Sequence, residues 1–271
     1  MSEQDGGGGG FVRSSRTAFA ACVIAAMVAA LPAPARAGTP PASAGRDVAA
    51  TADSLSDLPL KVVRPSPGDS APELAVFLTG DGGWAAIDKE ISDSLVRHGI
   101  PVVALNSREY LANKRTPERV ASDVARIMRH YGRVFARSEA VLIGYSRGAD
   151  ILPFVANRLP PDLRSRVRVI ALLGLAPNAN FKFHLIDLVT NHHRPDDLPT
   201  IPEAARLRGA HVLCFYGVEE KEAACRSLAD SVATVVAMPD GHHFGERYGV
   251  IAGRILSAVA SAASAVTTSR P

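Results

Sequence analysis

Short apolar runs alternate with longer stretches of helical periodicity along most of the chain. Each apolar run has the length of a buried strand and is rich in β-branched residues. Such alternation predicts an α/β fold, in which a mostly parallel sheet is covered by helices on both faces. The predicted strands are residues 74–79, 102–105, 140–143, 167–173, 211–216 and 232–238.

The clearest helix signal begins at Thr116. Thr116 is suited to be the N-cap, and Pro117 is suited to the first helical position. Apolar residues then recur at helical spacing, which predicts one buried face made of Val120, Val124, Ile127, Met128 and Tyr131.

Residues 1–37 have the features of an export signal. Arg13 and Arg16 precede an apolar stretch at residues 18–31, and residues 35–37 have the small-x-small pattern at which signal peptidase cuts. An uncleaved membrane anchor is the alternative, although the stretch is short for a spanning helix. Residues 38–58 lack periodicity and are predicted to be a flexible spacer, which leaves residues 59–265 as the folded domain. Residues 178–208 break the rhythm and resemble an insertion over the carboxyl edge of the sheet, where such folds bind ligands.

Composition and charge exclude some functions and favour export. The chain is 47% hydrophobic with a formal net charge of +3, which is ordinary for a globular protein and does not predict nucleic-acid binding. Cys22 would leave with the signal, so the mature chain keeps only Cys214 and Cys225. In an oxidising compartment these two form either a disulfide or a pair of free thiols, and we favour the disulfide.

Residues 144–148, with the sequence Gly-Tyr-Ser-Arg-Gly, match the pattern G-x-S-x-G. A predicted strand runs directly into the motif and a helical pattern follows it. This order is what a nucleophile elbow of the α/β-hydrolase fold requires, and it makes Ser146 the candidate nucleophile. The alternative is a serine that only caps an ordinary crossover helix.

A serine nucleophile needs a base and an acid, which follow the serine in this fold. His242 lies in a turn-rich segment after the last predicted strand and is the candidate base, with His243 as the competitor. Glu220 lies three residues after a glycine turn and is the candidate acid, with Glu219 in reserve. A disulfide between Cys214 and Cys225 would hold this acid loop rigid.

The glycine-rich segment at residues 79–84 follows the first long predicted strand. Its Gly82 amide and the amide of Arg147 are the candidate oxyanion-hole donors. Asp81, Trp84 and Tyr145 are candidate substrate contacts, although Asp81 could instead brace the turn and Trp84 could simply pack. The segment lacks the lysine and spacing of a P-loop, and no histidine and carboxylate spacing predicts a metal site, so we expect no cofactor.

Several segments together resemble the bacterial VirJ/AcvB virulence-protein family, in its single-domain, VirJ-like form. They are residues 79–84, 106–110, 114–117 and 144–148, the Cys214 to Glu220 stretch with Cys225, and residues 241–244. The resemblance implies a periplasmic α/β-hydrolase that removes aminoacyl groups, notably lysyl, from aminoacylated phosphatidylglycerol. Its partners would be a phospholipid headgroup at the membrane surface and components of type IV secretion. The chain departs from the family at Asn106 and at residues 110–112, which bears on acyl or headgroup preference.

Three functions are therefore under consideration. The first is a serine hydrolase of lipid aminoacyl esters that uses Ser146, His242 and Glu220. The second is a non-catalytic periplasmic protein that binds secretion components. The third is a general carboxylesterase or thioesterase.

Overall fold

The computed structural model describes residues 55–68, 71–184 and 194–268. The predicted signal at residues 1–37 and nearly all of the predicted spacer at residues 38–58 lie outside the described residues. Among the helices that are described, none is long and apolar enough to cross a membrane.

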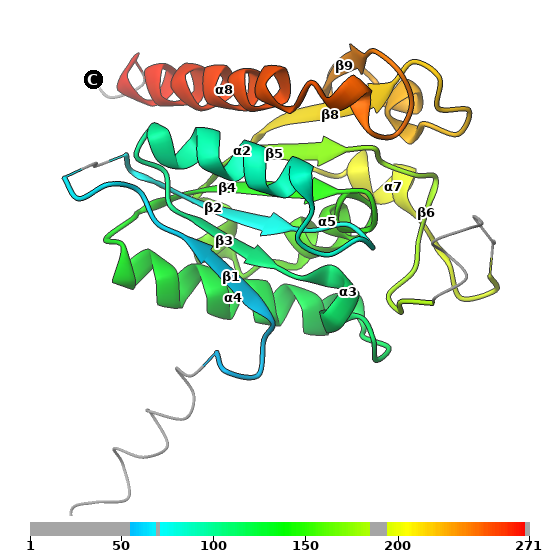
Figure 1. The fold of residues 1–271 in the computed structure, drawn as a ribbon, viewed down its shortest axis with the longest axis horizontal. Helices are drawn as coiled ribbons and strands as arrows, with labels where there is room; N and C mark the ends of the chain where they lie inside the picture. The colour runs from blue at the N-terminus through cyan, green and yellow to red at the C-terminus, as the bar shows by residue number, and fades with distance from the viewer. Residues whose placement is uncertain (1–54, 69–70, 185–193, 269–271) are drawn as a thin grey trace, which may run out of the picture. The chain divides into compact units, whose positions relative to one another are not determined.

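A seven-stranded sheet forms the centre of the fold, in the order β1-β3-β2-β4-β5-β8-β9 (Figure 1). The strands from β3 to β9 pair in parallel, whereas the edge strand β1 runs antiparallel to β3. The mostly parallel sheet predicted from the apolar runs is thus present. The strand bounds are Leu60–Val63 for β1, Glu73–Leu78 for β2, Val102–Leu105 for β3, Glu139–Tyr145 for β4, Val167–Leu173 for β5, His211–Gly217 for β8 and Thr234–Met238 for β9.

Helices cover both faces of the sheet, as the alternating pattern predicts (Figure 1). The helices α2 (Ala86–Arg97) and α8 (Tyr248–Thr268) pack on one face, and α4 (Pro117–Val134) and α5 (Arg147–Arg158) pack on the other. Successive strand side chains point to opposite faces, so Val76 joins one apolar core and Phe77 the other. The sheet therefore separates two apolar cores, one on each face.

The start of α4 follows its sequence signal. The side chain of Thr116 accepts a hydrogen bond of 3.2 Å from the Arg119 amide, and Pro117 occupies the first turn. Val120 and Val124 are buried beneath it, while Tyr131 is only half-buried against the same core.

Two residues just before the predicted start of the domain, Asp57 and Leu58, contact the rest of the fold. Leu58 is buried in the core, and Asp57 pairs with Arg126 of α4 at 2.8 Å. The last residues of the predicted 38–58 spacer therefore pack against the domain. The pattern missed β1 because this strand is four residues long and carries Lys61 in an otherwise apolar run.

Three short elements, β6, β7 and α7, follow β5 beyond the carboxyl edge of the sheet. The strands β6 (Asn178–Ala179) and β7 (Leu198–Pro199) pair with each other, and α7 (Thr200–Ala204) packs against α5. These elements lie within the predicted insertion at residues 178–208. The remaining short helices are α3 (Ser107–Tyr110), α6 (Pro161–Arg164), η2 (Ala224–Ser227) and η3 (Phe244–Glu246).

Candidate active site

Ser146 stands at the sharp turn between β4 and α5. Its backbone has φ 53° and ψ −121°, a left-handed conformation that costs a non-glycine residue about 1–3 kcal/mol. The flanking glycines make the turn sterically feasible: a Cβ on Gly144 would lie 2.4 Å from the Gly148 carbonyl oxygen, and one on Gly148 would lie 2.0 Å from the Leu78 carbonyl oxygen. The turn therefore places Ser146 at the N-terminus of α5, as the motif predicts.

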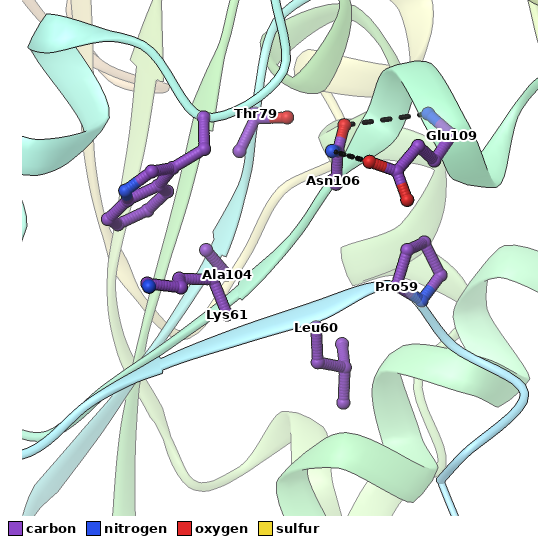
Figure 2. A pocket seen from close by; sticks show the side chains of 8 residues that line it. Pro59, Leu60, Lys61, Thr79, Ala104, Asn106 and Glu109 are labelled. Atoms are coloured by element: carbon purple, nitrogen blue, oxygen red, sulfur yellow. Dashed lines mark hydrogen bonds between the residues drawn. The ribbon is translucent and has the colours of Figure 1, made fainter.

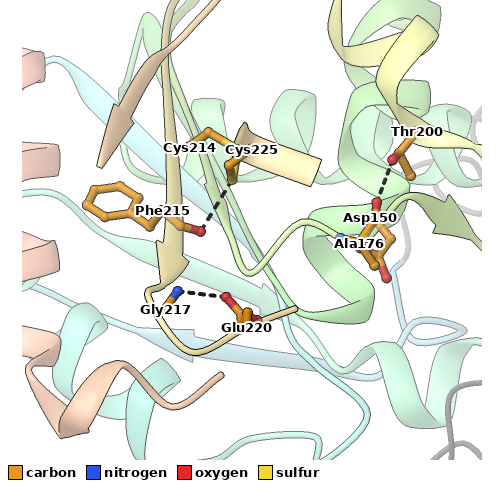
Figure 3. Close-up of a disulfide and its surroundings, with 8 residues drawn as sticks. All are labelled: Asp150, Ala176, Thr200, Cys214, Phe215, Gly217, Glu220 and Cys225. Atoms are coloured by element: carbon orange, nitrogen blue, oxygen red, sulfur yellow. Dashed lines mark hydrogen bonds between the residues drawn. A yellow bond between two sulfur atoms is a disulfide. The ribbon is translucent and has the colours of Figure 1, made fainter. Parts of the chain in front are cut away.

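His242 and Glu220 are in direct contact. The Nδ1 atom of His242 lies 2.5 Å from Oε1 of Glu220. The other carboxylate oxygen of Glu220 accepts a 2.6 Å hydrogen bond from the Gly217 amide, which Figure 3 shows. The two loops meet tightly, since a Cβ on Gly217 would lie 2.1 Å from the Gly241 carbonyl oxygen. The structure thus brings the preferred acid and the preferred histidine together.

Two neighbours fix the plane of the His242 ring. The ring stacks on Tyr145 with centroids 5.4 Å apart, and its edge lies against Gly174. Gly174 has φ +72°, and a Cβ there would lie 2.6 Å from Cε1 of His242. Any larger side chain at this position would displace the imidazole.

The contact changes the acidity of both partners. Burial opposes ionisation of Glu220, yet the hydrogen bonds from His242 and Gly217 prevail and lower its pKa. Burial likewise opposes a charged His242, but the hydrogen bond to Glu220 and the charges of Glu220 and Asp150 prevail and raise its pKa. The pair therefore favours a carboxylate beside an imidazole that readily accepts a proton.

The two reserve residues differ in position, because His243 borders the same cavity as Ser146 and His242, whereas Glu219 does not. Glu219 is exposed and does not border the cavity that holds Glu220. His243 is exposed as well, and its Nδ1 lies 3.2 Å from the hydroxyl of Tyr145. The histidine–carboxylate contact is therefore made by His242 and Glu220, and not by the reserve residues His243 and Glu219.

One cavity of about 840 Å³ collects most of the predicted site. It is bordered by the three triad candidates, by both oxyanion candidates and by two of the three predicted substrate contacts: Ser146, His242, Glu220, Gly82, Arg147, Asp81 and Tyr145. Asn178, Asn180 and Asp197 also border it, so the 178–208 segment lies beside the cavity as predicted for an insertion.

Asp81 and Arg147 form an ion pair at this cavity. The shortest contact joins Nη2 of Arg147 to Oδ2 of Asp81 at 2.9 Å, and both side chains are largely buried. Arg147 also donates a 3.4 Å hydrogen bond to the Asn180 carbonyl. Asp81 therefore braces its loop against α5, the alternative to substrate contact that the sequence analysis gave for it. It also borders the cavity.

Trp84, the third predicted substrate contact, does not border the main cavity. It borders a separate cavity of about 220 Å³, shared with Lys61, Ala104 and Asn106, whose surroundings Figure 2 shows. Tyr145 does border the main cavity, but its hydroxyl lies 3.2 Å from His243 Nδ1 and 3.4 Å from the His242 carbonyl. Its contacts are thus mainly with the histidine loop.

Asp150 is a cavity residue that the motif reading missed. It lies four residues after Ser146, the N-cap of α5, and its amide donates a 3.0 Å hydrogen bond to the Ser146 carbonyl. It is buried, and its Oδ1 accepts a 2.8 Å hydrogen bond from the Ala176 amide. Burial raises its pKa to about 7, against the opposing effects of that hydrogen bond and of Arg147. The helical spacing from the serine was the signal that could have found it.

The structure joins Cys214 and Cys225 in a disulfide (Figure 3). The bond connects β8 to η2, and Glu220 lies in the loop between them. No group of three or more histidine, cysteine, aspartate or glutamate side chains in the described part of the chain could hold a metal ion.

Solved structures with similar folds are α/β-hydrolases. The enol-lactonase from Burkholderia xenovorans LB400 aligns with a TM-score of 0.55 at 16% identity, covering 74% of this chain and 96% of that one. MenH from S. aureus gives 0.54 at 12% identity, with 75% and 98% covered. Est1E from Butyrivibrio proteoclasticus gives 0.51 at 12% identity, with 74% and 94% covered. At these identities the likeness establishes the α/β-hydrolase fold and not an activity.

Sequence comparisons give a narrower assignment. No curated protein matches the chain. The model of the family described as bacterial virulence protein (VirJ) matches residues 72–263, which include β2, the elbow, the acid loop and the histidine turn. The chain therefore belongs to the VirJ family of bacterial virulence proteins.

Proposed function

We propose that the protein is an exported serine hydrolase of carboxylic esters, with Ser146 as nucleophile, His242 as base and Glu220 as the residue that orients the base. The observation that carries the proposal is the 2.5 Å contact between His242 and Glu220 at the cavity that Ser146 also borders. A buried carboxylate on Nδ1 leaves Nε2 of the imidazole as the atom that exchanges protons.

The proposed reaction has two halves. Ser146 Oγ bonds to the ester carbonyl carbon while its proton passes to His242, and the carbonyl electron pair moves onto oxygen. Collapse of this intermediate breaks the bond to the alcohol, which leaves with the proton from His242. Water, deprotonated by His242, then attacks the acyl carbon, the bond to Ser146 Oγ breaks as the acid is released, and the proton on His242 returns to Oγ.

The amides of Gly82 and Arg147 are the proposed oxyanion donors. Arg147 is the first residue of α5, and amides at a helix N-terminus point away from the helix and favour negative charge. Gly82 borders the same cavity from the turn that Asp81 braces. The Asp81–Arg147 ion pair would therefore hold the two donor segments at a fixed separation.

We further propose that the substrate is an aminoacylated phosphatidylglycerol, such as the lysyl form. Membership of the VirJ family supports this substrate class. The cavity supports it too, because it is bordered by carboxylates, including Asp81 and Glu222, and by the cations Arg147, Arg194 and Lys221. A headgroup that carries both an ammonium and a phosphate matches such mixed charge.

The proposed location is the periplasm. The disulfide between two buried cysteines supports an oxidising compartment, where such bonds persist. The signal-like residues 1–37 support export on sequence grounds alone. A periplasmic location would bring the cavity to a membrane surface where aminoacylated lipids and secretion components are present.

The decisive experiment uses purified mature protein and vesicles that contain lysyl-phosphatidylglycerol, with free lysine as the readout. Wild type should release lysine and should be labelled by a fluorophosphonate probe, whereas Ser146→Ala should do neither. Ser165→Ala, at an exposed serine of the same domain, is the matched control and should behave as wild type. Hydrolysis of simple esters without lysine release would favour a general carboxylesterase. No turnover and no labelling of wild type would favour a non-catalytic protein that binds secretion components.

A further inference from the structure

Asp150 is a nearly buried carboxylate that the proposed reaction does not use. Asp150 is only 8% exposed, yet it borders the same cavity as Ser146 and His242. One oxygen, Oδ1, accepts the Ala176 amide at 2.8 Å. Among the described residues, no hydrogen bond uses the other oxygen, Oδ2. A largely buried carboxylate thus borders the cavity with one oxygen that no protein group among the described residues hydrogen-bonds.

Its local surroundings are fixed before any ligand arrives. The Ala176 carbonyl accepts a 2.5 Å hydrogen bond from the Thr200 hydroxyl, so Ala176 is held on both sides, by Asp150 and by Thr200 (Figure 3). Asp150 itself is in the first turn of α5, where its amide donates to the Ser146 carbonyl at 3.0 Å. A carboxylate held in this way can receive a cation with little loss of side-chain entropy.

We propose that Asp150 forms a subsite for the α-ammonium group of the acyl part of the substrate. A desolvated carboxylate is suited to bind a cation that donates hydrogen bonds, because the ion pair replaces the hydration that the carboxylate loses on burial. This inference rests on the proposed ester hydrolysis and goes beyond it: the enzyme selects aminoacyl esters by the α-amine, whatever the side chain.

The distance from the serine favours an α-ammonium over a side-chain ammonium. The Asp150 amide donates to the Ser146 carbonyl, so the backbones of the two residues are separated by one helical turn, a rise of about 6 Å. In an aminoacyl ester the α-nitrogen is about 2.5 Å from the carbonyl carbon that the serine attacks. An ammonium at that position lies between the two side chains, whereas the end of a lysyl side chain lies several bonds further away. Burial also raises the pKa of Asp150 to about 7, and a bound cation would shift it back toward the ionised form.

The test compares three ethyl esters that differ in where the ammonium lies. They are L-alanine ethyl ester, N-acetyl-L-alanine ethyl ester, and 6-aminohexanoic acid ethyl ester, which has only a distal amine. Wild type should show a higher kcat/KM for the alanine ester than for the other two. In Asp150→Asn the preference for the alanine ester over its N-acetyl analogue should fall by about tenfold or more, since a charge-assisted hydrogen bond is lost.

Asp88→Asn is the matched control. Asp88, like Asp150, is buried, accepts one backbone amide, from Ala85 at 2.8 Å, and has a pKa that burial raises to about 7. It does not border the cavity. Asp88→Asn should keep the wild-type preference among the three esters. A change of the same size in the ester preference of both variants would overturn the subsite. Equal losses of kcat/KM on the alanine ester and on its N-acetyl analogue in Asp150→Asn would do so too. A loss confined to the 6-aminohexanoic ester would overturn the α-position.

A binding measurement separates this proposal from the proposed function. L-alaninamide and N-acetyl-L-alaninamide cannot be turned over as esters, so their affinity for the full protein can be measured by calorimetry whether or not the protein hydrolyses anything. Wild type should bind L-alaninamide more tightly than the acetylated probe, and Asp150→Asn should lose that difference. Equal affinities of wild type for both probes would overturn the subsite even if ester hydrolysis is found.

Discussion

The imidazole Nδ1 of His242 lies 2.5 Å from Oε1 of Glu220, and this contact joins the loop after β8 to the loop after β9. Both loops leave the carboxyl edge of adjacent parallel strands. The second oxygen of Glu220 is bound by the Gly217 amide, so the carboxylate cannot rotate away without breaking two hydrogen bonds. The pair is therefore the most constrained part of the proposed catalytic apparatus.

The first prediction concerns this pair. Glu220→Gln should lower kcat for ester hydrolysis by roughly 10³-fold or more, because a neutral amide does not stabilise the imidazolium or hold the required tautomer. The measurement is kcat and KM on a short-chain ester, together with circular dichroism to verify folding. Glu219→Gln removes a neighbouring exposed carboxylate and should change kcat less than about threefold. Normal activity in Glu220→Gln would exclude Glu220 as the acid.

The second prediction concerns pH. Only neutral His242 can act as a base, so kcat/KM should fall as the pH decreases through the pKa of His242. That pKa is raised by Glu220 against the effect of burial, so the fall should begin at a higher pH than an ordinary histidine would give. In Glu220→Gln the acidic limb should shift to lower pH, because the partner that favours the protonated form is gone. A limb that stays in place would show that another group controls it.

Much of the fold could be predicted because its signals are local. Runs such as residues 74–78 are apolar throughout, which is typical of strands covered on both faces, and Thr116 followed by Pro117 marks the start of α4. The edge strand β1 carries weaker information because it is short and only half-buried. Its place beside β3 depends on tertiary pairing that no local pattern encodes.

The site was predictable where chain order and turn chemistry determine position. The glycines around Ser146, the turn before Glu220 and Gly241 before His242 each mark a strand end at the same edge of the sheet. The cavity that Trp84 borders could not be predicted, because the direction of a side chain after a glycine turn depends on a backbone angle that the sequence does not specify. Asp150 was missed because burial beside a cavity depends on how β6 and α7 pack over α5.

The third prediction uses the contact between Gly174 and His242. Gly174→Ala should lower kcat strongly, because the new Cβ would lie 2.6 Å from Cε1 of His242 and would move the ring. It should also cost about 1–2 kcal/mol of stability, since the backbone has φ +72°. Gly209→Ala carries the same type of backbone cost at φ +81° but meets nothing within 4 Å, so it should reduce stability alone. Equal activity in the two variants would contradict a catalytic role for the His242 position.

The fourth prediction concerns the disulfide. Cys214 and Cys225 are 11 residues apart, and closing a loop of this size stabilises a folded protein by about 3 kcal/mol in the chain-entropy model. Glu220 lies inside the loop, so breaking the disulfide should also make the Glu220 carboxylate more mobile. We expect a larger change in kcat than in KM. Urea unfolding and ester hydrolysis should be measured with and without a reductant. The double variant Cys214→Ala/Cys225→Ala should match the reduced protein and ignore the reductant. A reduced protein with wild-type stability and activity would show that the bond holds neither the fold nor the acid loop.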